Sequence, residues 1–439
     1  MTVELAHPST EPLAQRTPTE PAHPWWWFIS TTPGRIMAIG AILAMLGILS
    51  AFAISTTINE RQHQLTAVLD HTEPLAFTAG QIYTTLSVAD ASASTAFVAG
   101  TEPRPVRQRY EQAITDAAVA VTRASSGLTD PSLVALLSRI NAQLAVYTGL
   151  IETARTNNRV GNPVGSSYLS EASALMQDKI LPDAQRLYET TSARVDAETT
   201  TSAEIPAPVI IVVAATLGFG VFAHRWLARR TRRRVNIGLV AGGLAIAVMI
   251  VWVGSALVVS TAGSRTAKNT AADSLRLVTN LAITAQQARA DETLSLIRRG
   301  DEDVRKRSYY QRVDTMRQQL GEYLAREDSV DKSGLAQADQ LLEKWRLADQ
   351  RINAYITVGN YQAATQVALG SGEDDSTPAF DKLNDALNQG ILESRKQLRQ
   401  DILSARRVLS GTTVGGAMLS VGAALAVALG IWPRMSEYR

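Results

Sequence analysis

The sequence predicts an all-α protein with four transmembrane helices and two tandem extracytoplasmic four-helix bundles. Four long apolar segments carry no charge, and apolar residues recur every three or four positions in the stretches outside them. No run of alternating β-branched residues bounded by turns predicts a strand. The 439 residues include 43 basic and 41 acidic ones and no cysteine. This composition excludes disulfides, thiolate metal sites and nucleic-acid binding driven by bulk charge.

The four apolar segments are each long enough to cross a membrane, which takes about 20 residues. They span residues 36–55, 205–223, 237–261 and 411–432, and none contains Asp, Glu, Lys or Arg. A proline-rich tail, residues 1–35, precedes the first segment. Because this start is too long and too weakly basic for a signal peptide, we expect a retained transmembrane helix.

The loop between the second and third segments, residues 224–236, fixes the expected orientation. It holds six arginines and no acidic residue, and such loops remain in the cytoplasm. Residues 1–35 and the tail 433–439 are then cytoplasmic too, in a multi-pass protein of a bacterial inner (plasma) membrane. The arginines act as a topology signal, attract anionic lipid at about 1 kcal/mol each, or dock an acidic or phosphorylated partner. The candidate residues for partner or lipid binding are Arg229, Arg230, Arg232, Arg233 and Arg234.

The two stretches expected outside the membrane, residues 56–204 and 262–410, are each 149 residues long, which favours an internal duplication. SVADASASTAFVAG at 87–100 resembles QQARADETLSLIRRG at 286–300. Each of these runs ends in a glycine that is followed ten residues later by a tyrosine, Tyr110 or Tyr310. We expect each copy to be a membrane helix, an outer bundle and a second membrane helix.

Apolar spacing predicts the helices of the first bundle. A stripe at alternating three- and four-residue intervals runs from Leu65 to Ala96, and a similar stripe runs from Leu133 to Ile151. Asp130 followed by Pro131 reads as an N-cap and a first-turn proline. Pro74 is expected to bend the first helix.

Arginines gather next to the predicted turns of both bundles, which would lie far from the membrane. They are either solvated helix ends or a docking surface for an outer protein or ligand. The candidate outer partner-binding residues are Arg104, Arg107, Arg109, Arg155, Arg159, Arg298, Arg299 and Glu302.

Catalytic, cofactor-binding and metal-binding residues are not expected. The chain has only 5 histidines, and the two on one outer helix, His63 and His71, point about 80° apart at helical spacing. No phosphate-binding loop, dinucleotide fingerprint, nucleophile elbow or kinase signature occurs. The uncharged membrane segments also argue against a transporter. We therefore expect a protein that is not an enzyme and needs no cofactor.

The unit of membrane helix, four-helix bundle and membrane helix resembles the sensor halves of bacterial chemoreceptors and sensor kinases, but the chain shows no HAMP linker or signalling domain after it. Over its whole length the tandem arrangement resembles the GlnX-type actinobacterial membrane proteins. That resemblance implies an amino-acid-sensing relay for aspartate or glutamate. Its partners would be a solute-binding lipoprotein of the GlnH type outside and a Ser/Thr kinase of the protein kinase G type inside, with no catalytic residue to carry over.

The sequence leaves three functions open. The first is the non-enzymatic transmembrane relay between that lipoprotein and that kinase. The second is a structural scaffold for envelope assembly, and the third is a direct receptor for a small molecule. Membrane lipids are expected partners in each case, nucleic acid is not, and a homo-oligomer remains open.

Overall fold

The chain is all-α, as predicted. A computed structural model describes residues 32–98, 103–126, 128, 130–203, 207–231, 244, 248, 251–252, 254–256, 258–262, 267–297, 302–326, 330 and 332–436. Those residues form helices and turns and contain no strand. They belong to two compact units. One contains Ile54–Ala207 and Val251–Gly416, called here the first half and the second half.

The other compact unit takes its described residues from Met1–Ala53, Pro208–Ile250 and Ala417–Arg439. It includes the start of α2 (Thr32–Ala67) and most of α8 (Ala207–Thr231). Ser50 on α2 and Thr216 on α8 share a buried hydrogen bond of 2.7 Å between their hydroxyls. Many large apolar side chains of this unit are nevertheless exposed, among them Met45, Phe52 and Ile211. Exposed apolar surface of this kind is typical of contact with lipid or with another protein.

Within the described part of the chain, two helices are long and apolar enough to cross a membrane. Met37–Phe97 includes nearly all of the first predicted segment, whereas Pro131–Arg159 is a helix that the sequence assigns to a bundle. The apolar stripe of Pro131–Arg159 is buried in a protein core. The second predicted segment overlaps a shorter apolar helix, Ile210–Trp226, and α8 continues beyond it to Thr231. The count of four spans and the multi-pass topology stay predictions.

Helices of the first half surround one hydrophobic core. They are α3 (Glu73–Val98), α4 (Arg104–Ser125), α5 (Pro131–Arg159), α6 (Val164–Leu175) and α7 (Leu181–Ala203). Alanine dominates the core side of α3 and α4, whereas α5 contributes Leu, Ile and Tyr. Asp130 caps α5 as predicted, because its carboxylate accepts a 2.9 Å hydrogen bond from the Ser132 amide.

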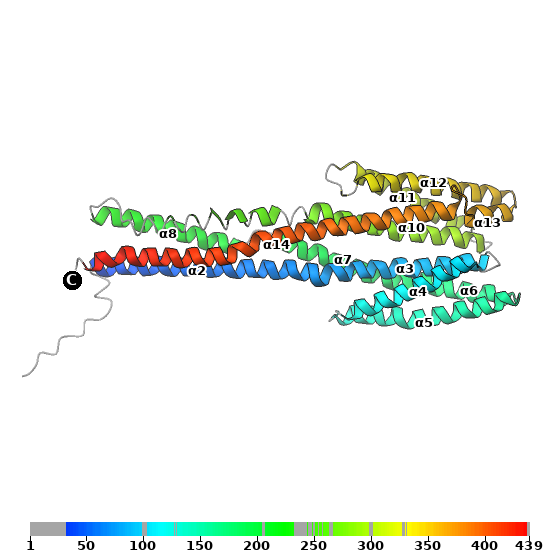
Figure 1. Cartoon of the computed structure of the whole chain (residues 1–439), viewed down its shortest axis with the longest axis horizontal. Coiled ribbons are helices and arrows are strands. Elements are labelled where there is room, and N and C mark those ends of the chain that lie inside the picture. Colours follow the sequence, from blue (N-terminus) through cyan, green and yellow to red (C-terminus); the bar gives the residue numbers. More distant parts are fainter. Residues whose placement is uncertain are drawn as a thin grey trace, which may run out of the picture. The chain divides into compact units, whose positions relative to one another are not determined.

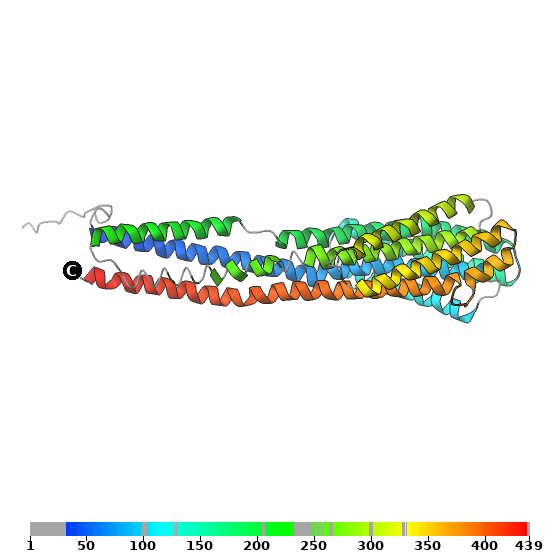
Figure 2. The ribbon, with the colours of Figure 1, turned by 90° about the horizontal axis from the view of Figure 1, so that it is seen from above.

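A second core lies in the second half. Its helices are α10 (Asp273–Ile297), α11 (Glu302–Leu324), α12 (Lys332–Thr357), α13 (Tyr361–Leu369) and α14 (Ser376–Ser436). Trp345 is fully buried at its centre, against the rings of Tyr309 and Phe380. Figure 1 and Figure 2 show the two halves side by side, with α3 and α10 packed along the line between them. Because both cores belong to one compact unit, two separate tandem bundles remain a prediction.

Short π-helices interrupt the long helices at related places. The first, η1 (Val68–Thr72), lies directly before α3, and η3 (Ala267–Ala272) lies directly before α10. Their first residues are 199 positions apart, which supports the internal duplication. A third, η2 (Met176–Ile180), joins α6 to α7. Both η1 and η2 end two residues before a proline, Pro74 or Pro182.

Pro74 accounts for a hydrogen bond that joins η1 in the first half to α14 in the second half. In this wide turn the Glu73 amide donates to the Val68 carbonyl, five residues back. The next amide in that pattern would be that of Pro74, which has no N–H, so the Leu69 carbonyl lacks its helical donor. Arg399 of α14 supplies one instead, since its Nη1 lies 2.9 Å from the Leu69 oxygen.

Ion pairs extend this junction along the line between the halves, called here the seam. Glu73 is 1% exposed and is paired with both Arg395 and Arg399 of α14. The Arg395 guanidinium also lies over the Phe77 ring, 4.0 Å from its centroid. Further along the seam, Arg109 makes a two-pronged contact with Asp381, at 2.7 and 2.9 Å.

We expect Glu73→Ala to lower the unfolding free energy by about 3 kcal/mol, because it leaves Arg395 and Arg399 without the buried carboxylate that they share. Thermal unfolding of the detergent-solubilised full chain measures this loss. Asp381→Ala is the matched control, since it removes the exposed seam pair and should cost about 1 kcal/mol or less. Equal losses for the two variants would contradict this account of the seam.

Candidate functional site

The first core contains a carboxylate that no cation partners among the described residues. Asp90 of α3 is 3% exposed and accepts hydrogen bonds from Tyr147, Ser173 and Gln177, at 3.3, 3.3 and 2.9 Å. All three donors are uncharged. Burial outweighs these hydrogen bonds and raises the pKa of Asp90 to about 6. A polar cluster that is only partly compensated thus sits inside the apolar core.

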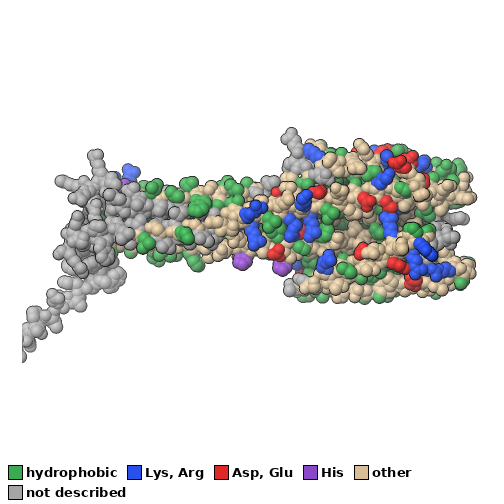
Figure 3. Space-filling model, viewed as in Figure 1, with side chains coloured by type: hydrophobic (Ala, Val, Ile, Leu, Met, Phe, Trp, Pro, Cys, Tyr) green, Lys and Arg blue, Asp and Glu red, His purple; other side chains and the backbone are tan. Residues whose placement is uncertain are grey.

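An adjacent cavity opens between the last turns of α3, the first turns of α4 and the last turns of α5. Its volume is about 50 Å³. Apolar side chains such as Phe97, Ile151 and Leu169 form part of its wall. Arg107, Arg155 and Arg159 also line it, and we therefore call it the arginine cavity. Figure 3 shows basic side chains gathered, with acidic ones, over this end of α4 and α5.

Tyr110 supplies the least satisfied polar group of the arginine cavity. The residue is 6% exposed and lines the cavity. Its buried hydroxyl has no hydrogen-bond partner within the described part of the chain. Burial raises the pKa of Tyr110, so the hydroxyl stays protonated and able to donate. An unpaired donor at this depth is costly and is commonly explained by a missing acceptor.

The charges at the cavity favour an anion. Arg155 is 13% exposed and pairs with Glu152, and Arg107 pairs with Glu111 at 2.7 Å. Arg159 adds a third guanidinium to the lining of the cavity. The cavity also lies at the start of α4, where the helix dipole favours negative charge.

The second half shows what occupies the corresponding place there. The buried stripe of α12 matches that of α5 at an offset of 198 residues, which aligns Trp345 with Tyr147 and Asp349 with Ile151. Asp349 is 4% exposed, and burial raises its pKa to about 7. A carboxylate thus stands in the second half where an isoleucine stands in the first.

Tyrosine positions are shared between the halves. On α11 the buried tyrosine is Tyr309, 1% exposed, whereas Tyr310 is partly exposed. By burial, Tyr309 is therefore the equivalent of Tyr110. The spacing from the preceding glycine instead matches Tyr110 with Tyr310, the next residue. The Tyr309 hydroxyl also has no hydrogen-bond partner among the described residues.

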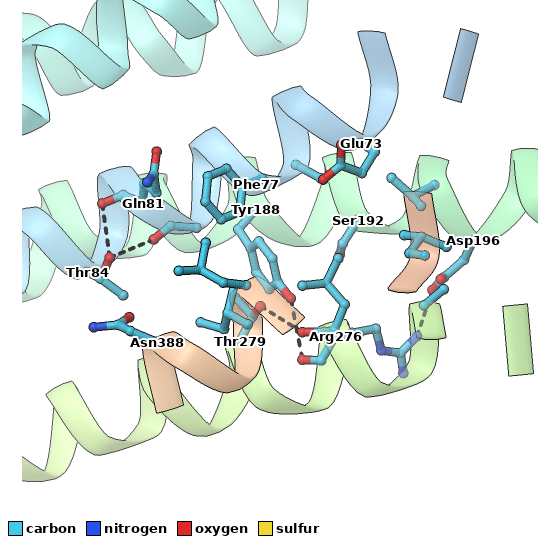
Figure 4. A pocket seen from close by; sticks show the side chains of 18 of the residues that line it. Glu73, Phe77, Gln81, Thr84, Tyr188, Ser192, Asp196, Arg276, Thr279 and Asn388 are labelled. Carbon is cyan, nitrogen blue, oxygen red and sulfur yellow. Dashed lines mark hydrogen bonds and ion pairs between the residues drawn. The ribbon is translucent and has the colours of Figure 1, made fainter. Parts of the chain in front are cut away.

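A larger cavity of about 280 Å³ lies at the seam, between α3, α7, α10 and α14. Figure 4 shows Phe77 and Tyr188 facing it, with Gln81 and Asn388 at one end and Asp196 and Arg276 at the other. Its charged groups are already paired within the chain: Arg276 binds Asp196 at 2.9 Å, and Glu73 binds α14. This cavity is large enough for a small ligand. Its walls are mainly apolar, however, and do not indicate which charged group a ligand would carry.

The predicted outer residues separate into several groups. Arg107, Arg155 and Arg159 come together at the arginine cavity. Arg109 instead faces the second half through Asp381, and Arg104 is exposed at the start of α4. Glu302 begins α11, but its side chain lies outside the described residues, as do Arg298 and Arg299.

The predicted cytoplasmic arginines are mostly outside the described part of the chain. Arg229 is exposed near the end of α8. Arg230 belongs to the same helix, but its side chain is not among those described. Arg232, Arg233 and Arg234 lie outside the described residues altogether.

Sequence reasoning missed the buried carboxylates Asp90, Glu292 and Asp349. Glu292 accepts a hydrogen bond from the Trp345 indole at 3.2 Å and is paired with Arg289. One signal for Asp90 was present, because an acid interrupts a run of Ala, Ser and Val in a helix with an apolar stripe. Acids inside such a stripe are expected only where partners satisfy them.

Comparison with known families gives one match. Residues 64–200 match the family model of the actinobacterial sensor domain. The match includes α3 to α6, most of α7 and every residue that lines the arginine cavity. It supports a sensing or signalling role for this chain. No match was found among curated proteins or among solved structures.

Asp90 should make the stability of the protein depend on pH. Its raised pKa means that the folded chain holds the proton more tightly than the unfolded chain. The stabilisation is complete below about pH 4 and is lost as the pH rises through about 6, to a total of about 3 kcal/mol. We therefore expect Asp90→Asn to be more stable than the parent protein at pH 7.5 and equal to it near pH 4.

Thermal unfolding of both proteins across this pH range measures the difference. Asp349 also titrates in this range in both proteins, so the comparison with the parent isolates Asp90. The exposed Asp116→Asn serves as the control and should leave the pH profile unchanged. A stability difference between Asp90→Asn and the parent that does not vary with pH would refute this assignment.

Proposed function

We propose that the chain is a non-enzymatic receptor that relays a signal across a bacterial plasma membrane. The observation that carries the proposal is the match of residues 64–200 to the actinobacterial sensor domain. In this proposal, both termini and the arginine loop 224–236 are cytoplasmic, and residues 56–204 and 262–410 lie outside. A solute-binding lipoprotein delivers an amino-acid signal to the outer side, and a Ser/Thr kinase reads it on the inner side.

Helix continuity supports such a relay. Helical structure is continuous from Thr32 to Val98, because the π-helical turn η1 links α2 directly to α3. The same helix thus contains the first apolar segment and the first residues of the sensor match. A partner can shift such an element only if it binds two arrangements of the protein with unequal affinity.

The arginine loop provides the test of the output. Charge reversal of Arg229, Arg230, Arg232, Arg233 and Arg234 should abolish association of the chain with a cytoplasmic kinase, because an acidic or phosphorylated partner loses its counter-charge. Crosslinking in living cells followed by mass spectrometry measures the association. Accessibility labelling of both termini controls for an inverted topology.

The parent chain distinguishes the relay from the envelope scaffold in the same experiment. Crosslinks to a solute-binding lipoprotein and a kinase support the relay. Crosslinks to envelope-building enzymes alone, or kinase association that survives charge reversal with the topology intact, would overturn it.

A second candidate is a direct small-molecule receptor. The arginine cavity favours it, because it is lined by three guanidinium groups and by a buried phenol that has no hydrogen-bond partner among the described residues.

A further inference from the structure

We propose that the arginine cavity of the first half binds a small free carboxylate directly. The inference rests on the sensing role proposed above and adds to it an input that needs no second protein. Two features of the described residues support it: a buried donor without a partner among them, and three arginines that line the same cavity.

The first feature is the Tyr110 hydroxyl. It is a protonated donor, 94% of the residue is buried, and it lines a cavity in which no acceptor from the described chain reaches it. A carboxylate oxygen is an acceptor only, so it matches this donor without requiring a further one. Binding such an oxygen removes the cost of the unpaired hydroxyl.

The second feature is charge. Arg107, Arg155 and Arg159 come from two helices, α4 and α5, and meet at one cavity. A guanidinium has five N–H donors, so an arginine that is paired with one glutamate can also bind a second carboxylate. The start of α4 adds the positive end of a helix dipole.

Size narrows the ligand class. About 50 Å³ admits a carboxylate group and little more. Arg155 is 13% exposed beside it, whereas Arg107 is 41% exposed. The head group would therefore be enclosed by Tyr110 and Arg155, and the remainder of the molecule would extend past Arg107 towards solvent. A single bound carboxylate would then join the ends of α3, α4 and α5.

The test uses the detergent-solubilised full chain without any partner. Isothermal titration calorimetry with acetate, succinate and L-glutamate, and with inorganic phosphate as the competing anion, measures binding. Tyr110→Phe removes only the hydroxyl, which no protein group requires, so the variant should fold and bind the carboxylate about tenfold more weakly. Tyr309→Phe removes the equivalent phenol of the second half and should leave the affinity unchanged.

Charge variants provide the second arm. Arg159→Gln should weaken binding, whereas Arg104→Gln, one turn before Arg107 and outside the cavity lining, should not. The proposal is overturned if no carboxylate binds at concentrations up to about 10 mM. It is also overturned if phosphate binds more tightly than every carboxylate, or if Tyr110→Phe and Tyr309→Phe have equal effects.

Failure of this inference and failure of the relay give different results. Loss of carboxylate binding with crosslinks to lipoprotein and kinase intact removes only the direct input. Carboxylate binding without those crosslinks retains the site and removes the relay.

Discussion

The contact between the first and second halves at η1 depends on the backbone N–H that Pro74 lacks. Pro74 has no N–H, and η1 leaves the Leu69 carbonyl without a helical donor. Since a buried carbonyl must be satisfied, a donor has to come from elsewhere in the chain. Arg399 provides it and at the same time pairs with Glu73. A local irregularity in one helix is thereby converted into a contact with a helix more than 300 residues away.

The same junction constrains the rest of the seam. Gly80, two turns along α3, lies so close to α10 that an added Cβ would stand 3.2 Å from the Thr279 methyl group. The halves therefore approach closely on the core side, while Arg109 and Asp381 join them further along. The 280 Å³ cavity lies along the same stretch of the seam, and Gly80 and Thr279 are among the residues that line it. The seam thus combines ion pairs and a close helix approach with unfilled space.

Local rules could predict much of the fold, because helices are encoded by spacing. The stripe from Leu65 to Ala96 is largely buried, and Asp130 caps α5, both as predicted. The sequence could also single out Arg107, Arg155 and Arg159, because they lie next to predicted turns at one end of the bundle. By contrast, the partners of Asp90 come from α5, α6 and η2, and those of Glu73 from α14. No periodicity encodes which distant residue meets a buried acid, so these contacts needed the structure.

The two cores can be compared by how their buried polar groups are satisfied. The second core pairs its buried Glu292 with Arg289 and surrounds it with hydroxyl and indole donors, so that its charge is compensated internally. Each half also keeps a buried acid with a raised pKa, Asp90 or Asp349, and a buried tyrosine hydroxyl, that of Tyr110 or Tyr309, without a hydrogen-bond partner among the described residues. Such unsatisfied groups lower stability, and a chain retains them at low cost only where another state or a ligand satisfies them. A ligand that binds such a group gains affinity for one arrangement over the other, and this difference is the only means by which binding can shift an equilibrium. In the proposed receptor, the Tyr110 hydroxyl of the arginine cavity is the group through which a bound carboxylate would create that difference.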